Sequence, residues 1–165
     1  MGVNRGKGVN NMSLLTLEDA VKIREDLRKQ GKKVVVTNGC FDILHVGHVR
    51  YLQQTKSYGD VLIVLLNSDS SVKKIKGDDR PLNNENDRAE ILSALSCVDY
   101  VVKFNETSVN NLLDALKPDI YTKGADYTLE TLPERDTVKK LNIEVKFIDF
   151  VKGKSTTNLI EKIKN

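Results

Sequence analysis

The sequence predicts an α/β fold in which a parallel sheet of five strands is doubly wound, with helices on both of its faces. Segments with strand patterns and segments with helix patterns alternate five times along the 165 residues, without an internal repeat or a linker. Two of the strand-like runs, at 34–36 and 61–66, are continuously apolar. Such runs are typical of strands that are buried on both faces of a parallel sheet.

The elements between these runs have recognisable start and stop signals. Thr16 and Asp19 resemble a capping box at the start of the first helix, and Gly31 ends that helix. In chain order, the predicted strands are Val34–Val36, Val61–Leu66, Val98–Phe104, Ile120–Thr122 and Ile143–Phe150, the last one at an edge of the sheet. The predicted helices are Leu17 to Gly31, Val49–Tyr58, Asn84–Ser96, Thr107–Leu116, a weak one at 130–141, and a terminal one from Gly153 through Ile163.

The stretch Asn38–His48 lies between the first strand and its following helix. It is therefore expected at the carboxyl end of a strand, where open α/β sheets bind ligands. Both histidines of the protein, His45 and His48, are found here. On a helical turn their spacing directs both rings to one place, and Gly47 lets a phosphate approach the helix N-terminus closely. The motif predicts a polyphosphate site rather than a helix cap with two solvated histidines.

A basic, glycine-containing loop, Lys73–Pro81, follows the end of the second strand. A run of charges is usually a solvated face of the protein. Here its position beside the expected phosphate site favours a function, because one lysine can neutralise part of a triphosphate. Lys76 and Lys74 are both candidates for that role, and the spacing does not decide between them.

Three hydroxyl residues, Ser155–Thr157, open the terminal helix after Gly153 and Lys154. A phosphate-binding P-loop would need a glycine five positions before Gly153, where the chain has Ile148. The hydroxyls are therefore expected to cap the helix. A capped helix N-terminus also attracts anions.

Composition excludes several other classes of protein. The net charge of +3 is spread along the chain, which argues against nucleic-acid binding and against binding to a membrane surface. A Gly-x-Gly-x-x-Gly pattern is absent, which counts against a nicotinamide-dependent dehydrogenase. The sequence has no His, Cys and carboxylate cluster of the kind that holds structural zinc. Cys40 and Cys97 form no Cys-x-x-Cys pair and are expected to be reduced thiols.

The amino-terminal residues 1–12 are polar and rich in glycine, so we expect a disordered extension before a single domain at 13–165. Met12 is an alternative start. The sequence shows no signal peptide and no apolar run near the ~20 residues of a membrane span. A cytoplasmic location is expected.

The pattern Gly39-x-Phe41-Asp42-x-x-His45-x-Gly47-His48 resembles the signature of the H-x-G-H nucleotidyltransferase superfamily. The resemblance covers nearly the whole chain, from about Lys33 to Ile163. Its further motifs occur in family order: Asn67-Ser68-Asp69, Lys76-Gly77-x-x-Arg80-Pro81, Val98-Asp99, Lys123-Gly124-x-Asp126-Tyr127 and Ser155-Thr156-Thr157-Asn158. The combination is most similar to the adenylyltransferase half of the bacterial enzymes that make ADP-heptose from ATP and D-glycero-β-D-manno-heptose 1-phosphate.

The resemblance implies a Rossmann-like fold of the nucleotidyltransferase type and a role for each matched residue. His45 and His48 would contact the α- and β-phosphates, and Lys76 would complete the catalytic set. The residues implied in nucleotide binding are Gly39, Cys40, Phe41, Gly47, Lys74, Gly124, Asp126, Tyr127, Ser155, Thr156 and Thr157. The residues implied in binding the sugar phosphate are Asp42, Asn67, Asp69 and Arg88. The metal expected is Mg²⁺ carried in with the nucleotide, without side-chain ligands, and the enzyme is expected to be a homodimer.

Two alternatives stay open at the level of the sequence. Glycerol-3-phosphate cytidylyltransferase shares the histidine motif and the Ser-Thr-Thr ending, but it carries an Arg-Thr-Glu-Gly-Ile segment where this chain has Phe150–Lys154. Lys152 or Lys154 would have to replace that arginine. A nucleotide-binding module without catalysis is the second alternative, since a fold does not dictate a function.

Overall fold

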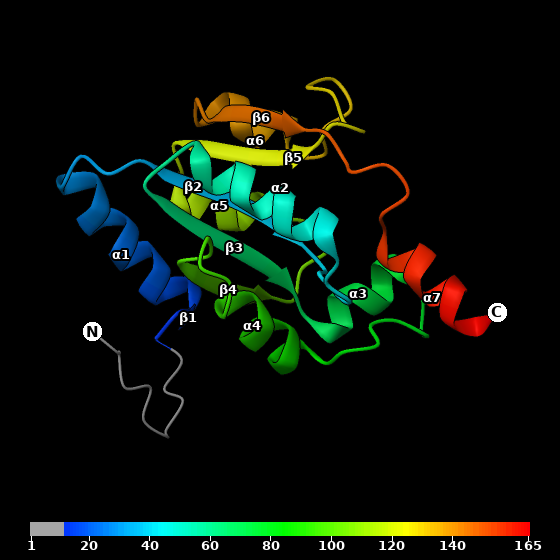
Figure 1. Cartoon of the computed structure of the whole chain (residues 1–165). Coiled ribbons are helices and arrows are strands. Elements are labelled where there is room, and N and C mark those ends of the chain that lie inside the picture. Colours follow the sequence, from blue (N-terminus) through cyan, green and yellow to red (C-terminus); the bar gives the residue numbers. More distant parts are fainter. Residues whose placement is uncertain (1–11) are drawn as a thin grey trace.

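The computed structural model describes residues 12–165, and the predicted extension lies outside the described residues except for Met12. Six parallel strands form one sheet in the order β1-β4-β3-β2-β5-β6 (Figure 1). The strands are β1 (Leu14–Leu15), β2 (Val34–Gly39), β3 (Val61–Asn67), β4 (Tyr100–Phe104), β5 (Ile120–Gly124) and β6 (Glu144–Ile148).

The α/β class and the parallel sheet are confirmed, whereas the predicted number of strands is wrong. All five predicted strands are present as β2 to β6, and β6 lies at an edge as expected. The sixth strand, β1, has only two residues, which pair with Val101 and Val102 of β4. A strand of this length is too short to show a period of two, so the sequence pattern does not reveal it.

The helices are α1 (Leu17–Lys29), α2 (Val46–Ser57), α3 (Asp69–Lys76), α4 (Glu85–Ser93), α5 (Asn110–Leu116), α6 (Arg135–Lys140) and α7 (Thr156–Lys164). Helix α2 begins three residues earlier than predicted, so His48 lies inside it. The basic segment predicted as a loop begins within α3, whose first turn is capped by Ser68 through a hydrogen bond from the backbone N–H of Ser71 at 3.2 Å. We therefore correct the loop to the residues after Lys76.

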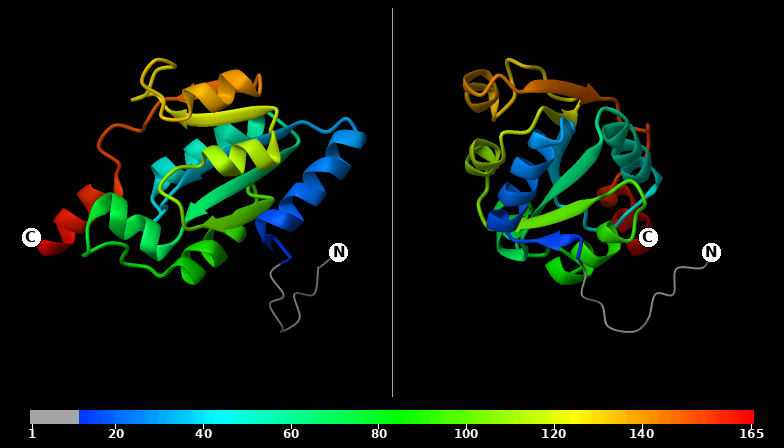
Figure 2. Two further views of the ribbon diagram at one scale, coloured as in Figure 1. Left: turned by 180° about the vertical axis from the view of Figure 1, so that it is seen from behind. Right: turned by 90° about the vertical axis from the view of Figure 1, so that its left-hand side faces the viewer.

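Both faces of the sheet are buried, as the apolar runs predict. Side chains alternate along β3: Ile63 and Leu65 pack into one core together with α1, α5 and α6. Leu62, Val64 and Leu66 pack into the other core, together with α2 and α4. Figure 2 shows the two layers of helices with the sheet between them. The fold is thus doubly wound.

The strand order places the ligand-binding motifs together. Strand β2 pairs with β3 on one side and with β5 on the other, so the direction of winding reverses at β2. Open α/β sheets bind ligands at this reversal, beyond the carboxyl ends of the strands. Helix α7 extends past these ends (Figure 1). No helix among residues 12–165 combines the length and the apolar character that crossing a membrane requires.

Candidate active site

A cleft of about 640 Å³ opens at the carboxyl ends of β2 and β5, between the starts of α2 and α7. It gathers segments that are far apart in the sequence. The residues predicted for the site that line the cleft are Gly39, Cys40, Phe41, Asp42, His45, Gly47, His48, Asn67, Lys76, Gly124, Asp126, Tyr127, Ser155, Thr156 and Thr157. Lys74, Asp69 and Arg88 are not among its lining residues.

The two histidines form the start of α2. His45 is the N-cap, and its Nδ1 accepts a hydrogen bond from the backbone N–H of Gly47 at 3.0 Å. In return, Nδ1 of His48 accepts from the backbone N–H of His45 at 3.3 Å. The two rings stack with their centroids 4.0 Å apart. This reciprocal capping orders both imidazoles before any ligand binds.

These contacts determine which nitrogen carries the proton. A neutral imidazole whose Nδ1 accepts a hydrogen bond must be protonated at Nε2. Burial, followed by the positive charges of His45 and Lys76, lowers the pKa of His48 to about 4. Burial, followed by the charge of Lys154, also lowers the pKa of His45. At neutral pH both histidines are therefore neutral donors through Nε2–H.

Gly47 is required by the position of the His45 ring. A Cβ atom at Gly47 would lie 2.7 Å from Cε1 and 2.8 Å from Nδ1 of His45, closer than real contacts allow. The sequence suggested that Gly47 lets a phosphate approach the backbone. The structure adds a second reason for the glycine, which is space for the capping imidazole.

Helix α7 begins on the opposite side of the cleft. Ser155 is its N-cap and accepts a hydrogen bond from the backbone N–H of Asn158 at 3.0 Å. Thr156 donates its hydroxyl to the carbonyl oxygen of Ile43, at 3.0 Å, and so connects α7 to the histidine motif. The hydroxyl cap and the histidine pair therefore lie in one cleft, as the sequence predicted for a polyphosphate site.

The geometry distinguishes the two lysines that the sequence left open. Lys76, the last residue of α3, lines the cleft, whereas Lys74 does not. Cys40 also lines the cleft, but burial raises the pKa of its thiol, against the opposing charges of Lys76, Arg88 and Arg80. A thiol that stays protonated is a poor nucleophile, so the direction of this pKa shift argues against a catalytic role for Cys40.

Asp42 holds the loop that follows α3. Its carboxylate accepts from Nε of Arg80 at 3.0 Å, and from the backbone N–H groups of Leu82 and Asn83 at 2.9 Å each. Burial alone would raise the pKa of Asp42, but the hydrogen bonds from Asn83, Leu82 and Arg80 lower it below the usual range. Asp42 is thus an ionised anchor of the loop, with its acceptor positions largely occupied by the protein.

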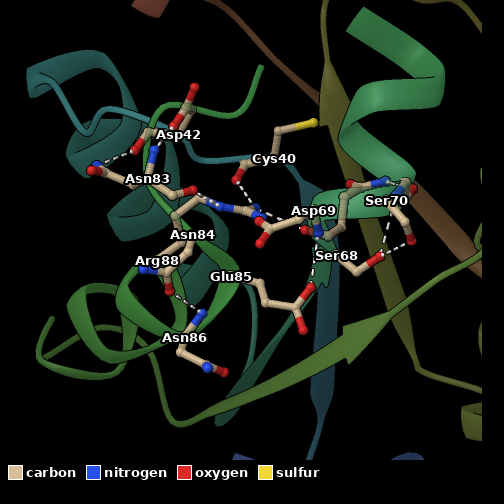
Figure 3. A network of polar contacts seen from close by, with 12 residues as sticks. Cys40, Asp42, Ser68, Asp69, Ser70, Asn83, Asn84, Glu85, Asn86 and Arg88 are labelled. Atoms are coloured by element: carbon tan, nitrogen blue, oxygen red, sulfur yellow. Dashed lines mark hydrogen bonds and ion pairs between the residues drawn. The ribbon is translucent and has the colours of Figure 1, made fainter. Parts of the chain in front are cut away.

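Arg88 is fully buried behind the cleft (Figure 3). Its Nη1 donates to the carbonyl oxygens of Cys40 and Asn67, both at 2.7 Å. Its Nη2 pairs with Asp69 at 2.8 Å, and Nε donates to the carbonyl oxygen of Asn83 at 2.9 Å. Arg88 and Asp69 were predicted to contact the sugar phosphate, but neither side chain lines the cleft and the two form an ion pair with each other. Both side chains are engaged within the protein, where they hold the ends of two strands in position.

Several lining residues were not predicted for the site. Lys123 and Glu134 form an ion pair at 3.5 Å, and the ring of Phe150 lies so close to Gly124 that it would overlap a Cβ atom at that position. Lys154 lines the cleft near the start of α7. Lys123 is the first residue of the matched Lys-Gly-x-Asp-Tyr motif, so the sequence alone could have predicted it for the site. The sequence gives no such signal for Glu134, which lies within the weakly patterned segment 130–141.

The described residues contain no group of three or more His, Cys, Asp or Glu side chains placed to hold a metal ion. Three carboxylates line the cleft: Asp42 is bonded to the loop, Glu134 is paired with Lys123, and Asp126 is the third. This donor set fits a metal that arrives on the phosphates of a nucleotide and keeps its waters, as Mg²⁺ usually does.

Comparisons with known proteins agree with the site. Residues 36–162 match the cytidylyltransferase-like family model. The chain is 51% identical over 156 residues to the bifunctional protein HldE of Syntrophotalea carbinolica, a match that covers 90% of this chain and 32% of the relative. The HldE of Geobacter sulfurreducens is 47% identical over 99% of this chain and 33% of its own length. The chain spans about a third of the length of these curated relatives.

Solved structures show the same fold. The crystal structure of the lipopolysaccharide core biosynthesis protein from Thermoplasma volcanium has a TM-score of 0.60 and 34% identity, and the match covers 75% of this chain and 100% of that one. The pantoate-β-alanine ligase of Francisella tularensis has a TM-score of 0.59 at 18% identity, over 93% of this chain and 77% of the ligase, and so shows the fold alone. With the family model matched along most of its length and the motif residues gathered in one cleft, the chain belongs to the cytidylyltransferase-like family.

Proposed function

We propose that this chain is an adenylyltransferase that joins ATP and D-glycero-β-D-manno-heptose 1-phosphate to give ADP-heptose and pyrophosphate. The observation that carries the proposal is the pair of neutral histidines facing a hydroxyl-capped helix across one cleft. The choice of substrate rests on the resemblance of the motifs to those of the enzymes that make ADP-heptose, and the similarity to the HldE relatives and to a lipopolysaccharide core biosynthesis protein supports it.

The reaction is a direct displacement at phosphorus. A phosphate oxygen of the sugar 1-phosphate attacks the α-phosphorus of ATP in line with the leaving group. The bond from this phosphorus to the bridging oxygen breaks, and the electron pair leaves with pyrophosphate. Because negative charge grows on the leaving group, donors that strengthen their hydrogen bonds in the transition state lower the barrier. The Nε2–H groups of His45 and His48 are suited to that role at the α- and β-phosphates.

Other cleft residues complete the binding of the nucleotide. Ser155 and Thr157 would hold the β- and γ-phosphates with their hydroxyls at the start of α7, and Thr156, whose hydroxyl is donated to Ile43, would do so with its backbone N–H. The helix dipole there also favours an anion. Lys76 would neutralise part of the triphosphate, and Mg²⁺ would arrive bound to it. Gly39, Cys40, Phe41 and Gly47 line the cleft and would contact the nucleotide, and Gly124, Asp126 and Tyr127 would border its base.

Asn67 and the turn held by Asp42, which also line the cleft, would form the side that binds the sugar phosphate. Arg88 and Asp69 support this side from behind rather than by contact with the sugar phosphate. The proposal includes a single domain at 13–165 and a cytoplasmic location, which were expected from the sequence itself, and a homodimer, which the family resemblance implies. Light scattering of the purified protein tests the dimer.

Pyrophosphate release from a two-way panel of substrates tests the proposed activity. One axis is ATP, CTP, GTP and UTP, and the other is heptose 1-phosphate and glycerol 3-phosphate. We expect turnover with ATP and heptose 1-phosphate only. Binding of ATP without pyrophosphate release from any pair of substrates would contradict the proposal and favour a nucleotide-binding module without catalysis.

The panel also tests the second candidate, glycerol-3-phosphate cytidylyltransferase, which the description of the matched family favours. Turnover with CTP and glycerol 3-phosphate would identify that activity. Lys154, which lines the cleft, would then occupy the place of the arginine in the cytidylyltransferase segment. Lys154→Ala should in that case abolish most of the cytidylyl transfer while the ATP reaction stays absent.

A further inference from the structure

The carboxylate of Glu134 lies in the wall of the cleft, and only one of its two oxygen atoms has a partner among the described residues. The side chain is 4% exposed. Its Oε1 pairs with Nζ of Lys123 at 3.5 Å, while Oε2 is buried and has no hydrogen-bond partner among the described residues. Buried acceptors without a partner are rare, because such a group loses its hydrogen bonds to water on folding and gains none in return. This one lies in the wall of a ligand cleft, so a ligand can supply the missing donor.

The local structure does not account for the orientation of Glu134. It immediately precedes α6, where an acidic side chain would normally bond to the free N–H groups of the helix, yet it forms no capping hydrogen bond. Instead it is close enough to Tyr121 that, after burial, its negative charge is the next cause that raises the pKa of the Tyr121 hydroxyl. The carboxylate is therefore directed to the interior side of the cleft rather than to its own helix.

Lys123 beside it also has donor capacity to spare. Its ammonium group has three N–H donors, and the described residues provide Glu134 and a long contact of 3.4 Å to the Tyr121 hydroxyl. The Tyr127 ring lies 5.1 Å from Nζ and covers the lysine from another side. The pair thus presents one free acceptor and one free donor next to each other, with almost no net charge.

We propose that Lys123 and Glu134 bind a sugar hydroxyl, with the hydroxyl hydrogen donated to Oε2 of Glu134 and the hydroxyl oxygen accepting from Nζ of Lys123. A phosphate would be repelled by the carboxylate, whereas a hydroxyl group is donor and acceptor at once. The inference rests on the proposed function, in which both substrates carry a sugar. The hydroxyl belongs either to the ribose of the nucleotide or to the acceptor sugar.

Glu134→Gln is the test, because it keeps the size of the side chain and removes its charge. Calorimetric titration would measure the affinity of the variant and of the wild type for ATP, 2′-deoxy-ATP, 3′-deoxy-ATP and heptose 1-phosphate. Glu130→Gln, at an exposed carboxylate of the same segment, is the matched control and should change nothing. Loss of a hydrogen bond to a charged group should weaken one of the two substrates by about 10- to 100-fold.

Two results would support the proposal. If the ribose is bound, the wild type binds one deoxy-ATP about 10- to 100-fold more weakly than ATP, and Glu134→Gln loses this discrimination. If the acceptor is bound, only the affinity for heptose 1-phosphate falls. Affinities within twofold for every ligand would overturn the proposal, and so would an equal loss for ATP and both deoxy forms, because the contact would then not be a hydroxyl.

A second variant at the same position tests whether the loss of affinity is caused by misfolding of the protein. Glu134→Asp keeps the charge but withdraws it from the cleft, so it should produce the same pattern of losses with the same melting temperature as the wild type within a few degrees. Because titration needs no turnover, the result is separable from the proposed reaction. A wild type that binds both substrates but releases no pyrophosphate would count against the adenylyltransferase proposal alone.

Discussion

The two helix starts that face each other across the cleft are built differently. The start of α2 follows a strand in the centre of the sheet, and its two histidines cap each other's backbone. The start of α7 follows an edge strand and a segment in which Phe150 is 61% exposed, and one hydrogen bond from Thr156 joins it to the histidine motif. The catalytic groups at the start of α2 are therefore fixed in position before a ligand binds, whereas the start of α7 is joined to the histidine motif by one hydrogen bond.

This difference predicts how the two sides respond to change. Donors that act in the transition state must be held to within a fraction of an ångström, since small displacements of catalytic groups are costly in rate. Groups that bind the outer phosphates contribute mainly to the affinity for the nucleotide. Variants on the α2 side should therefore lower kcat, and variants on the α7 side should raise the KM for ATP.

The largest expected effect is the loss of a histidine donor. His48→Ala should lower kcat by about 10²–10³, as for other removed transition-state donors, with the fold retained. His48→Gln, which places an amide N–H near the position of Nε2, should keep more activity than His48→Asn, which does not reach it. Pyrophosphate release measures all three variants. Turnover of His48→Ala like that of the wild type would exclude a catalytic role for this residue.

Gly47→Ala should change the activity of the site much more than the stability of helix α2. The new methyl group would displace the His45 ring, so we expect kcat to fall about 10- to 100-fold. Alanine is the better helix former by about 1 kcal/mol, but the displaced ring loses its capping hydrogen bond, so the free energy of unfolding should change little. Urea unfolding and turnover are measured on the same preparation. A variant that is destabilised and fully active would contradict the steric argument.

The α7 side should show a smaller effect of another kind. Thr156→Val removes the hydroxyl that bonds to the carbonyl oxygen of Ile43, and we expect the KM for ATP to rise about tenfold with kcat nearly constant. Thr157→Val, at an exposed hydroxyl, should raise this KM without changing the free energy of unfolding. A fall in kcat with an unchanged KM for Thr156→Val would mean that the two helix starts do not differ in the way described.

The smallest expected effect is on the pH dependence of stability. The ordinary pKa of 6.5 applies to His48 in the unfolded chain, and burial lowers it to about 4 in the fold. Between these values the unfolded state binds more protons, so the free energy of unfolding falls as the pH drops from 6.5 toward 4. We expect His48→Gln to lose about 1–2 kcal/mol less than the wild type over this range in urea unfolding. Equal losses would argue against a depressed pKa.

The elements that the sequence predicted well are those with a long pattern or a sharp motif. Continuous apolar runs located β2 and β3, and the histidine and hydroxyl motifs located both sides of the cleft. The two-residue strand β1 had too few residues for a pattern. The second half of helix α3 was predicted as the start of a basic loop at Lys73, whereas the helix runs from Asp69 to Lys76 and its buried residues Ser71 and Val72 pack it against the rest of the fold.

The roles of Arg88 and Glu134 could not be predicted from the amino-acid sequence alone. A sequence gives the charge of an arginine but not the three carbonyl oxygens that surround it, so Arg88 was assigned to the substrate although it is enclosed by the protein. Glu134 was not assigned at all, because its significance depends on which of its oxygen atoms lacks a partner. Both facts come from tertiary packing, which no local pattern contains.

The most direct test of the central claim is the protonation of the two histidines, which are the only ones in the protein. Nitrogen-15 NMR of the imidazole rings, followed over pH without nucleotide, distinguishes the two tautomers and gives both pKa values. We expect neutral rings protonated at Nε2 at pH 7 and a pKa near 4 for His48. A His48 pKa of 6.5 or above, or a proton at Nδ1 in either neutral ring, would contradict the account of the site.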